Sequence, residues 1–316
     1  MREYTTPAQF TVGDDESVVR TVFTHAEKTP HRVMYSRPEG EDWVAVTARQ
    51  FAEQVSGVAK GLIAAGVQPG DRVALLSATR YEWALFDYAI WAAGAATVPI
   101  YDSSSTEQIR WILQDSEAGI AVVETARHEA LFVDMPDTLR RTLRIDGGAV
   151  ETLIAEGAGV DDATLQARLD GIRADDLASL VYTSGTTGRP KGCMLTHRNF
   201  YSEVRGILTA SIGEVAKPGS RVLTFLPLAH VLARAVSLAV FEGGAAQAHW
   251  SDFGTISAQF ERYAPNTILG VPRVFEKVRD AAARKAAAGG RFNAASFAFA
   301  EETAIAYSES LDRGGP

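Results

Sequence analysis

Hydroxyl groups, glycines and one lysine are concentrated in the stretch LVYTSGTTGRPKG, residues 180–192. The glycines permit backbone conformations that turn several amide groups toward one bound anion. The lysine adds a compact positive charge suited to a polyphosphate. The stretch therefore predicts a phosphate-binding loop for a nucleoside triphosphate, and its candidate residues are Thr183, Ser184, Gly185, Thr186, Thr187, Gly188 and Lys191.

Two better-known phosphate loops do not fit these residues. A Walker-type loop needs glycine immediately before its lysine and a hydroxyl residue immediately after it. Here Pro190 precedes Lys191 and Gly192 follows it. The G-x-G-x-x-G spacing of dinucleotide-binding folds also fails, and a simple glycine turn would need neither the hydroxyls nor the lysine. The sequence favours a nucleotide loop of another type.

The elements that must position this loop alternate between helix and strand patterns. Thr47 and Gln50 form a capping-box pattern before a helical apolar repeat that ends near Gly66. Such alternation is typical of α/β folds, here layered, mainly parallel sheets flanked by helices. Strand patterns cover 73–78, 96–101, 119–124, 177–184, 221–226 and 267–271, and helix patterns cover 81–94, 106–117, 196–215, 231–243, 273–288 and 294–311.

The length of 316 residues is enough for about two domains. Residues 147–176 are rich in Gly, Ala and Asp, and we interpret them as a connector that carries one short helix. The resulting prediction is a first α/β subdomain over 1–176 and the start of a second over 177–316, which carries the loop. Aromatic residues at 297, 299 and 307 suggest that the last helix packs against another part of a protein.

Composition and charge exclude several other classes of protein. A formal net charge of −8 argues against a nucleic acid partner, which normally requires a basic surface. The single cysteine, Cys193, rules out an internal disulfide framework and fits the reducing cytoplasm. The longest apolar stretch, 89–101, is too short to span a bilayer, and peripheral membrane contact is left open.

Three stretches resemble one known family. YTSGTTGRPKG (182–192) with LTHRN (195–199) resembles the signature of the adenylate-forming, AMP-binding superfamily, which includes acyl-CoA synthetases. FLPLAHVLAR (225–234) and GVPRVFEKV (270–278) resemble segments of its long-chain fatty acid–CoA ligase subgroup. The resemblance spans roughly residues 45–300 and implies the incomplete large N-terminal domain of such an enzyme.

The resemblance also implies site roles and ligands. In this family the loop embraces the β- and γ-phosphates of ATP, and the first threonine, here Thr183, contributes to the Mg²⁺ site. His230 matches the catalytic-site histidine that borders the acyl-adenylate. Fatty acid and ATP form an acyl-adenylate with release of pyrophosphate, and coenzyme A then displaces AMP. Arg234 stands where some long-chain members have a tryptophan that gates the acyl tunnel.

Taken from its residues alone, His230 has two interpretations. It follows Pro227 and Leu228 at a strand-to-helix junction, where substrate-facing residues often lie, but a histidine at a helix start can also be purely structural. The family match favours the substrate site. For His197 we favour a structural role, and for Arg273 a substrate contact and a local ion pair are equal alternatives.

Several elements of the family are absent from the 316 residues. These are the Y-G-x-T-E-type segment, the ribose-binding aspartate, the hinge and the small C-terminal domain with its lysine. The chain is therefore expected to be the N-terminal portion of a ligase and inactive alone. Two alternatives stay open: an adenylation domain for another carboxylate, serving a carrier protein or a carboxylate reductase, and a non-catalytic nucleotide- or acyl-binding module.

Overall fold

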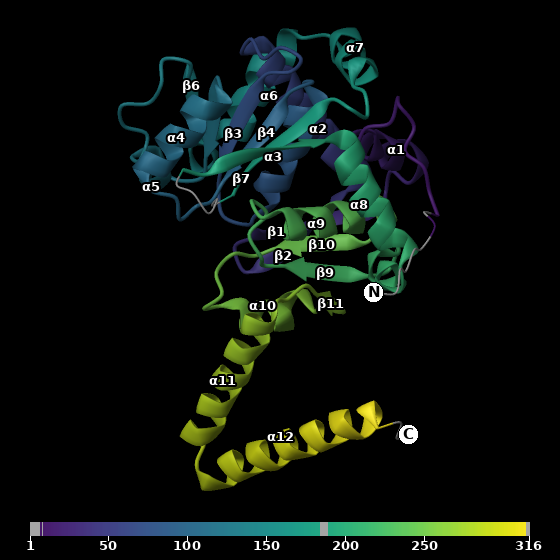
Figure 1. The fold of residues 1–316 in the computed structure, drawn as a ribbon, viewed down its shortest axis with the longest axis vertical. Helices are drawn as coiled ribbons and strands as arrows, with labels where there is room; N and C mark the ends of the chain where they lie inside the picture. The colour runs from purple at the N-terminus through teal and green to yellow at the C-terminus, as the bar shows by residue number, and fades with distance from the viewer. Residues whose placement is uncertain (1–6, 8, 184–188, 314–316) are drawn as a thin grey trace, which may run out of the picture. The chain divides into compact units, whose positions relative to one another are not determined.

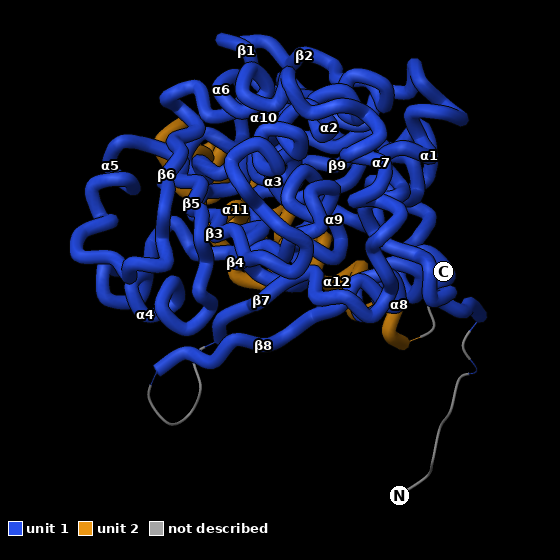
Figure 2. Tube along the Cα trace, turned by 90° about the horizontal axis from the view of Figure 1, so that it is seen from above, with its two compact units in different colours: residues 1–269 blue, residues 270–316 orange. Residues whose placement is uncertain are grey.

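The computed structural model describes residue 7 and residues 9–183 and 189–313. The chain forms two compact units, residues 1–269 and residues 270–316 (Figure 2). Within the described residues of the first unit, eleven strands form two sheets. Helices cover these sheets, as the ribbon shows (Figure 1). The predicted fold class, mainly parallel sheets flanked by helices, is confirmed.

The larger sheet carries the strand that leads into the predicted phosphate loop. Its order is β6-β5-β3-β4-β7-β8. All neighbours are parallel except β7 and β8, which are antiparallel. The strands are β3 (Arg72–Leu76), β4 (Ala96–Ile100), β5 (Ile120–Val123), β6 (Arg141–Arg144), β7 (Leu177–Thr183) and β8 (Lys191–Thr196).

The smaller sheet has the order β11-β9-β10-β1-β2. Its neighbours are parallel except β1 and β2, which are antiparallel. The strands are β1 (Val33–Glu39), β2 (Asp42–Thr47), β9 (Arg221–Thr224), β10 (Ala246–His249) and β11 (Thr267–Ile268).

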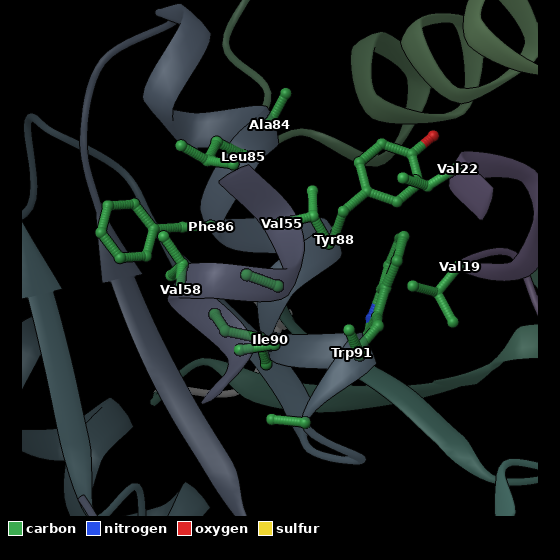
Figure 3. Packing of buried hydrophobic residues seen from close by; sticks show 14 of the residues in the cluster. Val19, Val22, Val55, Val58, Ala84, Leu85, Phe86, Tyr88, Ile90 and Trp91 are labelled. Carbon is green, nitrogen blue, oxygen red and sulfur yellow. The ribbon is translucent and has the colours of Figure 1, made fainter. Parts of the chain in front are cut away.

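One hydrophobic core joins the two sheets. It includes Val73 and Leu75 of β3 and Met34 and Tyr35 of β1, together with side chains from helices of the first unit. Figure 3 shows part of this core, where Val19 and Val22 lie near Tyr88 and Trp91. The helices of the unit are α1 (Arg20–Lys28), α2 (Ala48–Ala64), α3 (Tyr81–Ala92), α4 (Thr106–Ser116), α5 (Ala126–Glu129), α6 (Ala149–Glu156), α7 (Asp162–Gly171), α8 (His197–Thr209), α9 (Val231–Gly243) and α10 (Ile256–Tyr263).

Residues 73–76 of strand β3 are buried on both faces, which explains their unbroken apolar sequence. Val73 and Leu75 belong to the core between the sheets. Ala74 and Leu76 belong to a second cluster that contains residues of α4. Side chains alternate between the two faces of a strand, so a parallel strand covered on both sides must be apolar at every position.

The predicted division at residue 176 does not separate the two sheets. Strands β1 and β2 precede the boundary but pair with β10, whereas β7 and β8 follow it but pair with β4. The predicted connector also contains two α-helices, α6 and α7, rather than one. Helix α6 packs closely on α2, because a Cβ added to Gly61 would lie 2.1 Å from the carbonyl oxygen of Leu153.

The second unit contains α11 (Pro272–Ala288) and α12 (Arg291–Asp312). Both helices match sequence patterns, and Gly289 and Gly290 separate them. Arg279 of α11 pairs with Glu301 of α12, with 2.5 Å between Nε and Oε1. Of the aromatic residues on which the predicted packing of the last helix rests, Phe297 is partly buried, whereas Phe299 and Tyr307 are exposed.

The capping box that begins α2 is confirmed. The Thr47 side chain accepts a hydrogen bond from the Gln50 amide, and the Gln50 side chain accepts one from the Thr47 amide. We expect Thr47→Ala to lower the free energy of unfolding by about 1 kcal/mol, because a helix-end donor loses its partner. Urea unfolding checks this, with Thr152→Ala at an exposed position of α6 as the control. An equal effect in both variants would contradict it.

Candidate functional site

The predicted phosphate loop joins two strands that end side by side. Strand β7 ends at Thr183, β8 begins at Lys191, and these two residues are direct partners in the antiparallel register. Both side chains are exposed, and no carboxylate among the described residues pairs with Lys191. Ser184, Gly185, Thr186, Thr187 and Gly188 lie outside the described residues. The structure thus brings together the two ends of the predicted loop.

Helix α4 holds the residues just before Lys191. The indole Nε1 of Trp111 donates a hydrogen bond of 2.8 Å to the carbonyl oxygen of Pro190. The Arg189 guanidinium lies over the Trp111 ring, 4.6 Å from its centroid. A cation above an aromatic face is attracted by the ring's quadrupole. These contacts fix where the polypeptide enters β8.

Tyr182 anchors the other strand of the pair. Its hydroxyl donates a hydrogen bond of 2.7 Å to Asp115 of α4. Burial and the Asp115 carboxylate both raise the pKa of Tyr182, so the hydroxyl stays a neutral donor. Across the register, Gly192 leaves room for the ring, since a Cβ there would lie 3.1 Å from Tyr182 Cζ. Packing against the Tyr182 ring therefore explains the glycine at position 192.

His230 precedes α9 and caps it. Its Nδ1 accepts a hydrogen bond of 3.3 Å from the amide of Leu232. That acceptor role leaves the proton on Nε2, which is then a hydrogen-bond donor. The side chain is exposed. His230 therefore combines a structural cap with a donor that has no partner among the described residues, and the two interpretations of this residue are compatible.

Thr79 holds the segment that leads to His230. Its hydroxyl donates a hydrogen bond of 2.8 Å to the carbonyl oxygen of Leu226 and accepts one of 3.3 Å from the amide of Leu228. Thr79 follows β3 of the larger sheet, whereas Leu226 follows β9 of the smaller one. This bond therefore connects the carboxyl ends of the two sheets beside His230.

A cavity of about 70 Å³ lies where these carboxyl ends meet. It is lined by Ser77 after β3, Asp102 after β4, Phe225 after β9 and Ser251 after β10. Strand β7 runs parallel to β4, so Thr183 lies at the same edge of the larger sheet. Ligands of open α/β sheets bind outside the carboxyl ends of the strands. The candidate site is therefore this edge.

An apolar groove begins beside His230, between α8 and α9. It has a volume of about 310 Å³, and Val231 and Leu232 of α9 line it. The opposite wall comes from Leu195 of β8 and from Phe200 of α8, with Asn199 and Glu203 of α8 as the polar residues of the lining. Val231 and Leu232 are 41% and 46% exposed, which leaves apolar surface available to a ligand. A hydrocarbon chain suits such a surface.

Arg234 lies in the core, with 1% of its side chain exposed. Its Nε and Nη2 bind the two carboxylate oxygens of Asp87 in α3, at 2.8 and 2.5 Å. Its Nη1 donates a hydrogen bond of 2.7 Å to the hydroxyl of Ser179 in β7. The guanidinium therefore joins the helix after His230 to the strand that leads to the phosphate loop.

Thr97 of β4 completes this buried network. Its hydroxyl donates a hydrogen bond of 2.7 Å to the Asp87 carboxylate. Its carbonyl oxygen accepts a hydrogen bond of 2.7 Å from the Ser179 hydroxyl. Burial raises the pKa of Asp87, and the contacts from Arg234 and Thr97 oppose that rise. Buried charges persist only where they are paired and hydrogen-bonded. Sequence reasoning missed the pairing of Arg234 with Asp87, although each of these two residues places a charge inside an apolar helix pattern.

The remaining sequence candidates have structural partners. His197 is buried against Trp91, and burial together with Arg234 lowers its pKa to about 3, which supports the structural interpretation. Arg273 is exposed and pairs with Glu276 at 2.7 Å. Within the described part of the chain, no group of three or more His, Cys, Asp or Glu side chains could hold a metal ion.

The fold and this site define a class of protein. The family profile described as AMP-binding enzyme matches residues 22–306, so the chain belongs to the AMP-binding enzyme family. It is homologous to the N-terminal half of long-chain-fatty-acid–CoA ligase FadD15 of Mycobacterium tuberculosis. The two are 46% identical over 322 residues, which is 100% of this chain and 53% of that relative.

Other similar proteins extend this picture. Long-chain-fatty-acid–[acyl-carrier-protein] ligase AEE15 of Arabidopsis thaliana is 29% identical, over 79% of this chain and 37% of that protein. The solved N-terminal domain of FACL13 from Mycobacterium tuberculosis has a TM-score of 0.72 at 22% identity, over 84% of this chain and 65% of that one. The likeness to FACL13 concerns the fold alone. The chain spans about half the length, or less, of these curated relatives.

Proposed function

We propose that this chain is the N-terminal portion of an ATP-dependent, AMP-forming ligase that activates long-chain fatty acids and transfers them to coenzyme A. The observation that carries the proposal is the apolar groove of about 310 Å³ that begins at Val231 and Leu232, directly after His230. A fatty acid whose chain occupied this groove would present its carboxylate near His230. Homology to FadD15 supports the same substrate class.

The proposed roles follow from the positions of the residues. The β- and γ-phosphates of ATP would be bound by the loop residues predicted from the sequence, with Lys191 as the positive charge at the end of the loop. These residues are Thr183, Ser184, Gly185, Thr186, Thr187, Gly188 and Lys191. Thr183 would contribute to holding Mg²⁺, which neutralises phosphate charge when it is bound. The Nε2 proton of His230 would orient the fatty acid carboxylate for in-line attack on the α-phosphate. Catalysis of this kind depends on positioning and charge stabilisation rather than on a covalent enzyme intermediate.

The thiol acceptor separates the proposal from its main alternative. AEE15, by its name, is a ligase for an acyl-carrier protein, whereas FadD15, by its name, is a ligase for CoA. Identity to FadD15 is much higher, so we propose coenzyme A. We also propose a cytoplasmic location, and no described helix has the length and apolarity to cross a membrane. Because the chain spans half of FadD15, we propose that residues 1–316 alone do not complete the reaction.

A substitution in the groove tests the acyl site. We expect Leu232→Asn in the complete gene product to raise the KM for palmitate about tenfold and to leave the KM for ATP unchanged. The expected size corresponds to losing roughly 1–2 kcal/mol of apolar contact with the chain. Palmitate-dependent exchange of pyrophosphate into ATP measures both constants. Ile212→Asn, at an apolar position that is 57% exposed and outside the groove, is the matched control. Equal effects of the two substitutions would refute the acyl site.

A further inference from the structure

Another cavity lies at one edge of the smaller sheet. His230 lies at the opposite edge of the same sheet. The volume of the cavity is about 420 Å³, and it is lined at the amino ends of β1, β9 and β10, which are parallel. His230 instead follows the carboxyl end of β9. The polar side chains that line the cavity are Arg32, Ser36, Ser220, Arg221 and Tyr263. The candidate active site therefore leaves this cavity unexplained.

Arg32 brings an unneutralised charge to this cavity. Its side chain is partly buried, and its guanidinium has no hydrogen-bond or ion-pair partner among the described residues. It lies against Gly244, where an added Cβ would be 2.5 Å from Nη1. Partial burial of an unpaired cation is unfavourable. The Arg32 guanidinium is therefore available to an anion that enters the cavity.

Arg221 adds a second guanidinium in a fixed orientation. It lies over the Tyr263 ring, 4.6 Å from the centroid, and its Nη2 donates to the carbonyl oxygen of Tyr263. An arginine has five N–H donors, so most of them are left for a ligand. The Ser36 and Ser220 hydroxyls are further donors on the lining. No carboxylate is found among the described residues that line the cavity.

We propose that this cavity binds the phosphate group of a soluble phosphomonoester. Two guanidiniums and two hydroxyls match the oxygens of a phosphate, which arginine binds through two parallel hydrogen bonds. The cavity is also large enough for a small organic phosphate. This site lies on the other edge of the sheet from His230 and does not depend on the proposed ligase activity. A phospholipid headgroup carries the same chemistry and is separated by the experiment.

Isothermal titration with inorganic phosphate tests the site in the 316-residue chain. All measurements use a Lys191→Met background, which removes the charge of the predicted phosphate loop. We expect phosphate to bind this protein and Arg32→Met to weaken the binding at least tenfold. Arg127→Met, at an exposed arginine of α5 outside the cavity, is the matched control and should leave the affinity unchanged. No binding in the background protein, or equal affinity with and without Arg32, overturns the proposal.

A second variant keeps the test decisive if Arg32→Met fails to fold. Ser220→Asp adds a carboxylate to a cavity lining that carries two arginines, so we expect it to raise the melting temperature and to weaken phosphate binding at least tenfold. Unchanged phosphate binding in this variant overturns the proposal. Cosedimentation with phosphatidic acid vesicles is the lipid arm, with phosphatidylcholine vesicles as reference. If the protein binds these vesicles only when Arg32 is present and does not bind inorganic phosphate, the site belongs to a lipid. That result overturns the proposal of a soluble ligand.

Discussion

Replacing Arg234 by methionine is expected to lower the free energy of unfolding by about 3–5 kcal/mol. The guanidinium is 1% exposed and binds both carboxylate oxygens of Asp87, so its loss leaves a charged group buried without its cation. Methionine keeps much of the volume against Trp91 and Phe200, whose rings face the guanidinium at 5.1 and 4.8 Å. Urea unfolding measures the effect.

A double variant separates the charge from the packing. Arg234→Met with Asp87→Leu removes both charges, and we expect it to be more stable than Arg234→Met alone, because no unpaired carboxylate remains. Arg127→Met, at an exposed arginine with no ion pair among the described residues, should change the stability by less than about 0.5 kcal/mol. An Arg234→Met loss as small as the control's would contradict the role of the buried pair.

The pH dependence of the Arg234→Met variant has a definite sign. Burial already raises the pKa of Asp87, and removal of Arg234 takes away the largest contact that opposes the rise. A carboxyl whose pKa is higher in the folded state than in the unfolded state contributes stability at low pH and loses it as the pH rises. The stability difference between variant and unmodified protein should therefore shrink as the pH falls from about 8 to about 5. A constant difference would exclude Asp87 as its source.

Lys191→Ala is expected to lower ATP–pyrophosphate exchange by the complete gene product on the order of 10²-fold, the usual cost of losing one preorganised group that stabilises transition-state charge. Lys191 is exposed at the start of β8, directly across from Thr183, and no described carboxylate neutralises it. Its loss should therefore affect phosphate binding and leave the fold intact.

Arg189→Ala is a neighbouring control for that substitution. Arg189 lies over Trp111 and not in the strand pair, so its loss should change the exchange rate much less than Lys191→Ala does. An unchanged kcat and KM for ATP in Lys191→Ala would count against the phosphate-loop assignment.

The sequence predicted the buried elements well because burial leaves a strong pattern. Strands β3, β4 and β5 are covered on both faces, and their residues are almost all apolar. Exposed or short strands carry no such signal. Residues 191–196 form β8 although most of its side chains are at least partly exposed, and β10 contains the buried polar residues Gln247 and His249. Both strands pair with neighbouring strands, so their pairing rather than an apolar pattern distinguishes them.

The candidate site shows the same limit. The 180–192 stretch was recognised because hydroxyls, glycines and a lysine meet within one segment. The Arg234–Asp87 pair joins residues that are 147 positions apart, so periodicity could not reveal it. Its one visible signal is a charge inside each of two apolar helix patterns, α3 and α9. Pairing between distant segments also explains why the predicted boundary at 176 does not divide the sheets. Strand β1 pairs with β10, which is far away in the sequence.

The central proposal, fatty acid activation by a protein whose N-terminal portion is this chain, is tested most directly by substrate-dependent exchange of labelled pyrophosphate into ATP. The complete gene product should exchange label with palmitate and Mg²⁺ and form palmitoyl-CoA when coenzyme A is added. Residues 1–316 alone should show neither activity. Exchange that depends on amino acids but not on palmitate would contradict the proposal, and so would full activity of the 316-residue chain.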